Sequence, residues 1–359
     1  MIGLMTFQNA DNYGAVLQAY ALQKKVDDIG CDNEYIDFEY NMSKSYNGSV
    51  VKNTPEKFKK LFHPIKLMRR RIRSSGFKKF RENYLRISRH HYSGDCEIRT
   101  CRKYDRYIVG SDQVWNFDIT NQSHAFLLDF VADSIPKYSY ASSFGKSALS
   151  ESEKSIFKYE LNRFNSISVR EAVGAELIHE LSDKPVSICL DPSMLLLKSE
   201  WEGIAVKPYK KKYVLIYAMT DTPGITDFAR GLSKQMNTGI VAIGLKKKYP
   251  GIKNIYAVSP EQWLGYIANA EATVTNSFHG TVFSILFKKS VYIEYLPSGW
   301  TVNSRLEDIV RLFGLENRII KNDIAFSEMN YEKIDRILAE KRLQSLKYLK
   351  GICTQNEQN

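Results

Sequence analysis

Along the chain, short apolar runs alternate with longer segments in which apolar residues recur at the spacing of a helix. At the amino-terminal end an apolar run at residues 2–7 is followed by a turn-forming stretch, a helical pattern at 15–29 and a second strand-like run at 34–38. Two strands joined through a helix in this way predict a βαβ unit, which connects parallel strands. The pattern therefore favours an α/β fold.

The same alternation continues to the end of the chain in two series. In the first, strands are predicted at 105–110, 137–141, 166–169 and 186–190, with a helix at about 150–165. In the second, strands are predicted at 213–219, 240–244, 254–258, 272–275 and 291–295, with helices at 224–236, 260–270, 281–288 and 305–313. Two consecutive series of similar size predict two Rossmann-like, doubly wound domains facing one another across a cleft.

The predicted domain bounds follow from these series. The amino-terminal α/β domain spans residues 1–197, and a polar stretch at 198–212 is expected to link it to the carboxy-terminal α/β domain at 213–326. A terminal helix and tail are expected at 327–359. A chain of 359 residues is long for a single core, which agrees with two domains.

Charge is concentrated in one stretch, residues 52–92, which we interpret as an insert of amphipathic helices in the first domain. It holds fourteen lysines and arginines against Glu56 and Glu82, so its net charge is +12. The net charge of the chain is +11, so the other residues together carry −1. Apolar residues lie between the cations. A solvated insert, an anionic membrane surface or lipid-linked acceptor, and nucleic acid are three interpretations of such a stretch, with nucleic acid the least favoured. Contact with a membrane or lipid carrier is assigned to Arg69, Arg70, Arg71 and Arg73.

Several classes of protein are disfavoured by composition. No apolar run approaches the roughly 18 residues that span a bilayer, and the amino terminus lacks the charged start of a signal peptide, so a cytoplasmic protein is expected. The five cysteines, at 31, 96, 101, 189 and 353, lack the spacing of a metal site, so we expect reduced thiols and no metal. The first βα loop lacks the GxGxxG pattern of dinucleotide sites.

Residues 273–280 (TVTNSFHG) give the strongest functional signal, since a short strand runs into a helix through a polar turn. Asn276 or Ser277 is expected to cap the helix, which places His279 in its first turn. A helix amino terminus behind a parallel strand is a ready anion site, and Gly280 is expected to let a ligand approach the backbone. An imidazole beside a bound anion can donate a proton near neutral pH. The alternative is that His279 only completes the cap.

Other polar residues follow strands where open α/β sheets bind ligands. Ser111, Asp112 and Gln113 come directly after the strand at 105–110, and Arg170 follows the strand at 166–169. Asp112 is either a site residue or a helix cap, and Arg170 either grips an anion or pairs with Glu171. Arg305, at the start of a predicted helix, is expected to point into the cleft.

Five motifs together resemble the polysaccharide pyruvyl transferase family. They are 7–23 (with ADNYGAVLQAYALQ at 10–23), IVGSDQVWN at 108–116, SVRE at 168–171, LDP at 190–192 and NSFHG at 276–280. They occur in the family's order and span most of the chain. One departure is that Ser277 stands where many members have an arginine.

The resemblance implies a GT-B-like two-domain fold and a transferase that uses phosphoenolpyruvate as co-substrate, with no further cofactor. The enolpyruvyl group would be moved to two hydroxyls of one sugar, forming a cyclic pyruvate ketal and releasing phosphate. The acceptor would be a galactose- or mannose-type sugar in a bacterial capsule or exopolysaccharide precursor. The charge of residues 52–92 adds the hypothesis that this precursor is carried on a polyprenyl diphosphate at the inner face of the plasma membrane.

The resemblance also implies roles for residues. His279 and Arg170 match the family's active-site histidine and arginine, and we assign His279 as general acid. Arg170, Arg305 and the turn from Ser277 to Gly280 would bind phosphate and carboxylate. Asp112 is expected to orient or deprotonate the acceptor. From their positions alone, Asn12, Tyr13 and Gln113 are predicted to hydrogen-bond the sugar, and Ser111 is predicted to contact substrate.

Two alternatives stay open from the sequence. One is a GT-B glycosyltransferase that uses a nucleotide sugar, because fold does not fix function. The other is a non-catalytic glycan-binding relative, which the Ser277 departure would favour. The acceptor sugar, the positions of the ketal and the oligomeric state cannot be predicted from these patterns.

Overall fold

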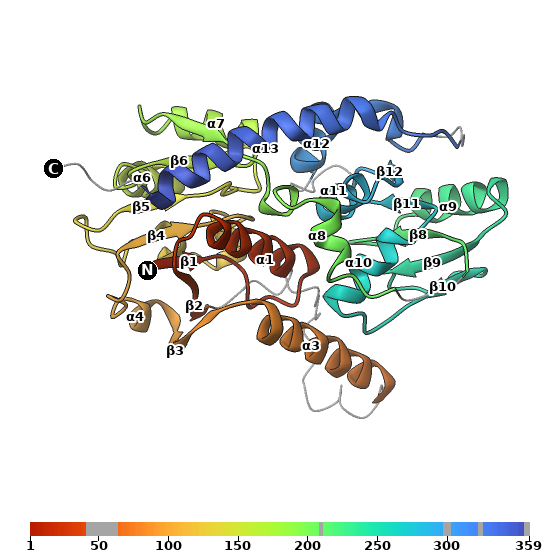
Figure 1. Ribbon diagram of the computed structural model, residues 1–359, viewed down its shortest axis with the longest axis horizontal. Helices are drawn as coiled ribbons and strands as arrows, with labels where there is room; N and C mark the ends of the chain where they lie inside the picture. The colour runs from red at the N-terminus through yellow and green to blue at the C-terminus, as the bar shows by residue number, and fades with distance from the viewer. Residues whose placement is uncertain (41–63, 208–210, 297–302, 322–325, 355–359) are drawn as a thin grey trace. The chain divides into compact units, whose positions relative to one another are not determined.

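The structure is a computed structural model that describes residues 1–40, 64–207, 211–296, 303–321 and 326–354 (Figure 1). The chain divides into two compact units. Unit 1 comprises Met1–Phe62, Arg81–Leu195 and Glu340–Asn359, and unit 2 comprises His63–Phe80 and Leu196–Ala339.

Unit 1 is built on a parallel sheet with strand order β3-β2-β1-β4-β5. Its strands are β1 (Ile2–Met5), β2 (Asn33–Glu39), β3 (Ile87–Ser93), β4 (Arg106–Val109) and β5 (Lys137–Ser139). Isolated bridges Tyr138–Ser166 and Ser142–Val169 connect β5 and the segment after it to a further parallel pair, β6 (Ile167–Val169) and β7 (Val186–Ile188). β1 is buried along its whole length, as expected for a central parallel strand.

Successive residues of these strands pack into two different cores, one on each face of the sheet. Leu4 and Ile108 lie in one core with residues of α1 and of the terminal helix α13 (Tyr331–Thr354), whereas Met5 and Val109 lie in the other with residues of α6 and α7. The helices of unit 1 are α1 (Tyr13–Asp28), α4 (Gly94–Ile98), α5 (Phe117–Thr120), α6 (Glu151–Leu161), α7 (Ala172–His179) and the short 3-10 helices η1 (Ala125–Leu127) and η2 (Pro192–Met194). Helices on both faces define a doubly wound sheet.

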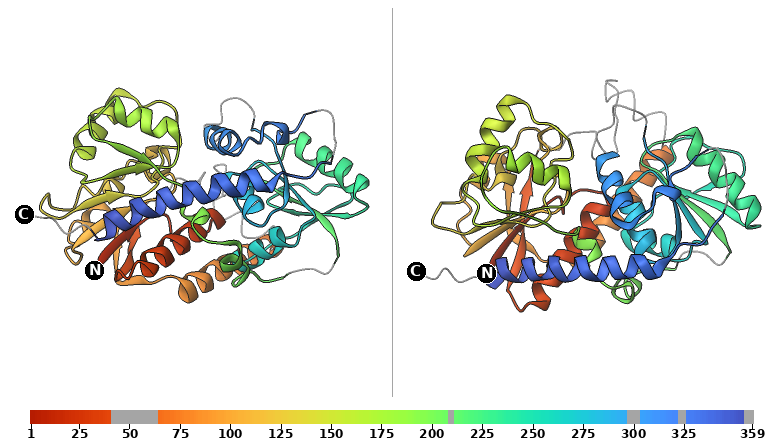
Figure 2. Two further views of the ribbon diagram at one scale, coloured as in Figure 1. Left: turned by 45° about the horizontal axis from the view of Figure 1, so that its top comes forward. Right: turned by 90° about the horizontal axis from the view of Figure 1, so that it is seen from above.

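Unit 2 repeats this arrangement, with the parallel order β10-β9-β8-β11-β12 (Figure 1). Figure 2 shows the elements of this unit from two further directions. Its strands are β8 (Tyr213–Tyr217), β9 (Gly239–Ile243), β10 (Ile252–Asn254), β11 (Ala272–Thr275) and β12 (Ser290–Ile293). Its helices are α8 (Lys198–Glu202), α9 (Pro223–Gln235), α10 (Pro260–Ala268), α11 (Phe278–Leu286), α12 (Asn303–Phe313) and η3 (Glu316–Arg318). Both sheets thus show the 3-2-1-4-5 order of Rossmann-like domains, and the predicted α/β fold is confirmed.

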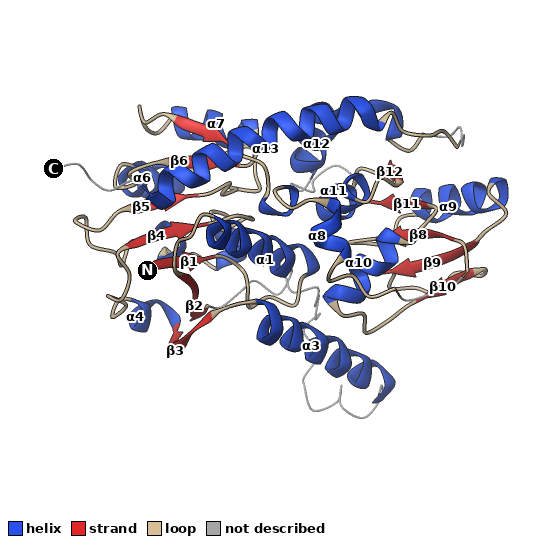
Figure 3. Cartoon of the chain, viewed as in Figure 1, coloured by secondary structure: helices blue, strands red, loops and turns tan. Residues whose placement is uncertain are grey.

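The basic stretch differs from the predicted insert. Helix α3 (Pro64–Tyr84) confirms a helical segment there, but β3 shows that its last residues belong to the first sheet (Figure 3). The sequence concealed this strand because only Ser88 and Tyr92 are buried, and Arg89, His90 and His91 between them are exposed. Residues 52–63 of the predicted insert lie outside the described part of the chain.

Two further segments differ from the predicted bounds. The expected linker begins with α8, whose Trp201 is fully buried and meets the ring of Phe283 at 4.9 Å, so this segment is part of the core of unit 2. The terminal helix α13 (Tyr331–Thr354) contributes residues to both units, and Leu349, Ile352 and Cys353 complete a core of unit 1. Within the described ranges, no helix is long and apolar enough to cross a bilayer.

Candidate functional site

The turn between β11 and α11 carries the residues with the strongest functional signal. β11 lies between β8 and β12 in the sheet, and its four residues are all buried. Ser277 is the N-cap of α11, and its Oγ accepts a hydrogen bond from the amide of Gly280 at 3.4 Å. The first turn of α11 therefore begins at the carboxyl edge of a parallel sheet, where a helix amino terminus favours anions.

Of the two residues predicted to cap α11, only Ser277 does so, and Asn276 instead bonds the loop after β8. Its Oδ1 accepts from the amide of Met219 at 2.7 Å, and its Nδ2 donates to the carbonyl of Thr220 at 3.0 Å. Asn276 thus fastens the β11–α11 turn to the loop after β8. Neighbouring side chains thus cap the helix and tie the turn to the adjacent loop.

His279 is the second residue of α11 and is only 7% exposed. Its ring lies edge-on to the ring of Phe278, with the centroids 5.0 Å apart. The imidazole is therefore held in the first helical turn, as the sequence predicted. A buried imidazole at a helix amino terminus is well placed to exchange a proton with an anion bound there.

Gly280 is explained by packing within unit 2, which differs from the predicted close approach of a ligand. A Cβ at this position would lie 2.7 Å from Cδ1 of Tyr217 and closer still to Oγ1 of Thr275. The first turn of α11 can therefore rest on β8 and β11 only if residue 280 has no side chain. The geometry gives Gly280 a structural role, and its predicted contact with substrate stays a prediction.

Replacing Gly280 by Ala is expected to lower the free energy of unfolding by roughly 2–3 kcal/mol, because the added methyl group overpacks a buried contact. Gly351→Ala is the matched control, since a Cβ there meets no atom within 4 Å and the site lies inside α13. That control should stabilise by about 0.5–1 kcal/mol. Urea unfolding measures both variants, and equal stability of Gly280→Ala and the wild type would contradict the packing argument.

Arg305 is the third residue of α12, a helix that packs against α11. The residue is 8% exposed, so its guanidinium is largely withdrawn from bulk solvent. Arg305 and His279 therefore lie on adjacent helices of one unit. This is the arrangement expected if both serve one anionic ligand, although a direct contact with that ligand stays a prediction.

Glu294 was missed by the sequence reasoning, although it directly follows β12 at the same edge of the sheet. Its carboxylate accepts from the hydroxyl of Thr222, and burial raises the pKa of Glu294 above its ordinary value despite hydrogen bonds from Thr222 and the amide of Ile225. Thr222 is the N-cap residue of α9, so a carboxylate of the protein already occupies that helix amino terminus. The amino terminus of α11 is thus the better candidate for an external anion.

In unit 1, the residues predicted around Arg170 form a buried cluster at the carboxyl ends of β4 and β6. Nη1 of Arg170 donates to Oδ2 of Asp191 at 2.7 Å, and its Nε lies 3.5 Å from Oε2 of Glu171. Its Nη2 lies 3.8 Å from Oδ1 of Asp112. The Arg170 side chain is 2% exposed. The predicted pairing with Glu171 is therefore present, within a larger group of charges.

Three carboxylates around one guanidinium make this cluster acidic overall. Burial alone would disfavour the charge, but attraction to Asp191, Glu171 and Asp112 outweighs it and raises the pKa of Arg170 above its ordinary value. An anion approaching Arg170 would also meet its carboxylate neighbours. The geometry therefore favours Arg170 as a positioning residue for the acids, and its predicted grip on phosphate or carboxylate stays a prediction.

Ser111 is fully buried, and its hydroxyl donates to the carbonyl of Ala141 at 2.6 Å. Its amide donates to Oε1 of Gln18 at 3.3 Å. The first bond joins the segments that follow β4 and β5, and the second joins the end of β4 to α1, which favours a structural role for Ser111 over the predicted contact with substrate.

The other predicted sugar contacts lie on loops at the same edge of the first sheet. Asn12 is the N-cap of α1 and accepts from the amide of Ala15 at 3.3 Å, and Tyr13 is the first residue of that helix. Gln113 is 3% exposed, and its Oε1 accepts from Nδ2 of Asn116 at 3.2 Å. The fold thus brings these residues to one edge, as predicted from their positions after β1 and β4.

Tyr40 is a second residue that the sequence reasoning missed. It follows β2, and its ring stacks on those of Phe7 and Phe38. Its hydroxyl is buried and has no hydrogen-bond partner among the described residues. Burial, and then the nearby Asp112 carboxylate, raise the pKa of Tyr40 well above its ordinary value. A phenol that keeps its proton next to Asp112 can donate a hydrogen bond to a ligand oxygen.

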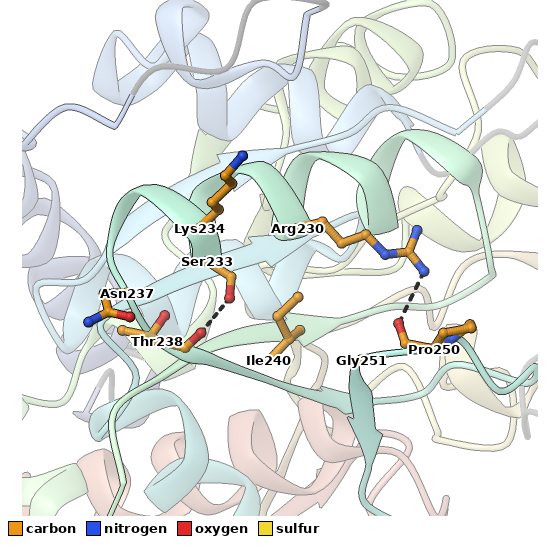
Figure 4. A pocket seen from close by; sticks show the side chains of 8 residues that line it. All are labelled: Arg230, Ser233, Lys234, Asn237, Thr238, Ile240, Pro250 and Gly251. Atoms are coloured by element: carbon orange, nitrogen blue, oxygen red, sulfur yellow. Dashed lines mark hydrogen bonds between the residues drawn. The ribbon is translucent and has the colours of Figure 1, made fainter.

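A cavity of about 420 Å³ lies elsewhere in unit 2 (Figure 4). It is lined by Arg230, Ser233, Lys234, Asn237, Thr238, Ile240, Pro250 and Gly251. These residues lie around the end of α9 and the starts of β9 and β10, on the opposite edge of the sheet from the β11–α11 turn. Ligands of open parallel sheets bind at the other edge, so we do not assign this cavity to the site.

No cluster of three or more histidine, cysteine, aspartate or glutamate side chains suited to a metal ion is found in the described part of the chain. All five cysteines are free thiols.

A family model, polysaccharide pyruvyl transferase, matches residues 12–293. The match covers the β11–α11 turn as well as the buried cluster around Arg170. No curated protein matches the sequence significantly.

Several solved structures are similar in fold at low identity. UDP-GlcNAc 2-epimerase from Methanocaldococcus jannaschii, in complex with UDP-GlcNAc and UDP, is 14% identical with a TM-score of 0.45, and the match covers 94% of this chain and 99% of that one. ADP-heptose LPS heptosyltransferase II from E. coli is 13% identical with a TM-score of 0.37, covering 96% and 98%. The S. aureus MnaA–UDP structure is 12% identical with a TM-score of 0.46, covering 98% and 89%. Likeness at this level carries no inference about function.

Proposed function

The chain belongs to the polysaccharide pyruvyl transferase family, and on that premise we propose that it moves the enolpyruvyl group of phosphoenolpyruvate to two hydroxyls of one sugar. The product is a cyclic pyruvate ketal, and inorganic phosphate is released. We propose a galactose- or mannose-type sugar in a surface polysaccharide precursor as the acceptor.

The reaction requires two additions to the same carbon. A proton is delivered to the methylene carbon of phosphoenolpyruvate, and the first sugar hydroxyl adds to the neighbouring carbon and loses its own proton. Phosphate then departs with its bonding electrons, and the second hydroxyl adds and gives up its proton, which the phosphate can accept. Each step gains from a group that holds or transfers a proton, typically by a factor of about 10²–10⁴.

The observation that best supports this proposal is the placement of His279 in the first turn of α11, behind a cap made by Ser277. We assign His279 as the general acid for phosphoenolpyruvate. The helix amino terminus and Arg305 would bind the phosphate and carboxylate groups. Ser277 is engaged in capping, so the charge that an arginine supplies at this position in many members would come from Arg305.

We assign the sugar hydroxyls to the acidic cluster of unit 1. Asp112 is the proposed acceptor of the hydroxyl proton, and the phenol of Tyr40 is a proposed hydrogen-bond donor to the same sugar. Arg170 holds Asp191 and Glu171 by charge and so fixes the position of this cluster. Asn12, Tyr13 and Gln113 are the proposed further contacts to the sugar.

We propose further that the acceptor is carried on a polyprenyl diphosphate and that the enzyme works at the inner face of the plasma membrane. The cations of α3 support this, because they suit an anionic head group and an anionic lipid surface.

A ligand screen tests the proposed donor. Phosphoenolpyruvate should raise the melting temperature of the protein, because a ligand that binds only the folded state stabilises it by mass action. UDP and other nucleoside diphosphates should leave it unchanged. Stabilisation by a nucleoside diphosphate but not by phosphoenolpyruvate would contradict the proposal and favour a nucleotide-sugar glycosyltransferase. Stabilisation by glycan alone would favour a non-catalytic glycan-binding protein.

A further inference from the structure

Helix α3 combines a dense positive charge with apolar side chains that lie in solvent. Ile65, Met68 and Ile72 are 60%, 54% and 50% exposed. Positions i, i+3 and i+7 fall on one side of an α-helix, so these three side chains form a continuous stripe, which we call the apolar stripe. Exposed large apolar residues grouped in this way usually mark a contact with a partner or a membrane.

A different side of α3 packs against the rest of unit 2, and within the described part of the chain the apolar stripe stays exposed to solvent. Phe77 and Phe80 are fully buried, and the guanidinium of Arg69 lies 3.9 Å from the ring centroid of Tyr256. A Cβ on Gly76 would approach Cβ of Ser259 to 3.0 Å, so the helix rests closely on the start of α10. The helix is therefore anchored along one side and presents the apolar stripe on another.

The charge of α3 narrows the choice of partner. Between Pro64 and Phe80 the helix has no acidic residue and seven cations: Lys66, Arg69, Arg70, Arg71, Arg73, Lys78 and Lys79. A second copy of this face would bring the same charges together, which opposes self-association through the stripe. Nucleic acid would neutralise the cations, but its phosphates and sugars would not bury three aliphatic side chains. An anionic bilayer satisfies both, because apolar side chains enter the acyl boundary while cations stay at the head groups.

We propose that α3 is an interfacial helix that holds the protein on an anionic membrane, with Ile65, Met68 and Ile72 inserted below the head groups and the exposed cations on the same side, Arg71 and Lys79, paired with them. Arg69 and Arg73 contribute less than the sequence suggested, since both are half-buried over aromatic rings. The membrane interaction does not depend on catalysis.

Vesicle co-sedimentation of the full-length protein, without phosphoenolpyruvate, tests this proposal. The wild type should bind phosphatidylcholine vesicles that contain roughly 30% phosphatidylglycerol and not vesicles of phosphatidylcholine alone. Replacing the apolar stripe by serines (Ile65→Ser, Met68→Ser and Ile72→Ser together) should lower the partition coefficient about 100-fold, because three inserted side chains are lost. Replacing Arg71 and Lys79 by glutamines should lower it roughly 30-fold and weaken its dependence on salt.

Two matched controls test whether the effects are specific to α3 or follow from any loss of exposed apolar or basic side chains. Tyr159, Val206 and Leu343 are 66%, 49% and 72% exposed, and their replacement by serines should leave binding unchanged. Lys333, Lys347 and Lys350 are exposed on α13, and their replacement by glutamines should have far less effect than the α3 cations. Unchanged melting temperatures of all variants show that folding is intact, as expected for exposed positions.

Three results would overturn the proposal. The first is equal binding to neutral and anionic vesicles, or to neither. The second is a concentration-dependent dimer in sedimentation velocity that the serine variant abolishes, which would assign the stripe to a second copy. The third is retention on an oligonucleotide that needs the cations but not the stripe. Because the assay contains no donor, failure here leaves the proposed pyruvyl transfer intact.

Discussion

Replacing His279 by Ala is expected to lower kcat by about 10²–10⁴-fold, the range that general acid–base catalysis contributes. The imidazole is buried in the first turn of α11, and the Ala variant keeps a good helix former at that position, so folding should be retained. Steady-state rates of phosphate release from phosphoenolpyruvate, with an acceptor present, measure the effect. The melting temperature should change little by comparison.

His179→Ala is the control for this prediction. His179 is exposed at the end of α7 and has no place in the proposed site, so its variant should keep the rate of the wild type. A His279→Ala enzyme that retained more than about a tenth of the activity would exclude His279 as the general acid and leave it as part of the helix cap.

Replacing Arg170 by Met is expected to lower the free energy of unfolding by about 3–5 kcal/mol, the cost of leaving buried charges without their partner. Asp191, Glu171 and Asp112 would lose the guanidinium that lies among them. Adding Asp191→Asn to the variant should recover part of the loss, because it removes one of the uncompensated carboxylates. Denaturant unfolding of the single and double variants measures both effects.

Arg230 provides the contrast for Arg170. It pairs with Asp227 at 2.9 Å with side chains that are 40% and 69% exposed, and exposed pairs contribute only about 0–1 kcal/mol. Arg230→Met should therefore be nearly neutral. If Arg170→Met were as mild as this, while affinity for phosphoenolpyruvate fell sharply, Arg170 would be a ligand of the donor, as the family resemblance implies, and the positioning role would be refuted.

The elements of the fold could be predicted where the periodicity was strong. β11 begins and ends at the predicted residues, since its four apolar or β-branched residues are bounded by polar ones. β3 could not be predicted, because a parallel edge strand with three consecutive exposed basic or imidazole residues lacks the apolar run by which such strands are identified. α8 was not predicted because it is short and mostly polar, and Trp201 is its one buried side chain.

The candidate site was predictable in position but less so in chemistry. Asp112 and Arg170 follow strands of unit 1 and His279 follows a strand of unit 2, each at the carboxyl edge where open parallel sheets bind ligands. The sequence did not show that Arg170 is paired with Asp191, which lies 21 residues further along the chain and competes with an anion for the guanidinium. The role of Gly280 depended on Tyr217 and Thr275 beneath it. Contacts between residues distant in sequence decide these roles, and local patterns do not record them.

The measurement that tests the central claim most directly is a transfer assay with the purified wild-type protein, phosphoenolpyruvate and a panel of galactose- and mannose-terminated lipid-linked acceptors. Phosphate release and the mass of the acceptor are followed together. Pyruvyl transfer predicts phosphate release that depends on one acceptor, with one pyruvate added to that acceptor and one water lost. Acceptor-dependent release without the ketal, or modification of an acceptor only when a nucleotide sugar replaces phosphoenolpyruvate, would contradict it.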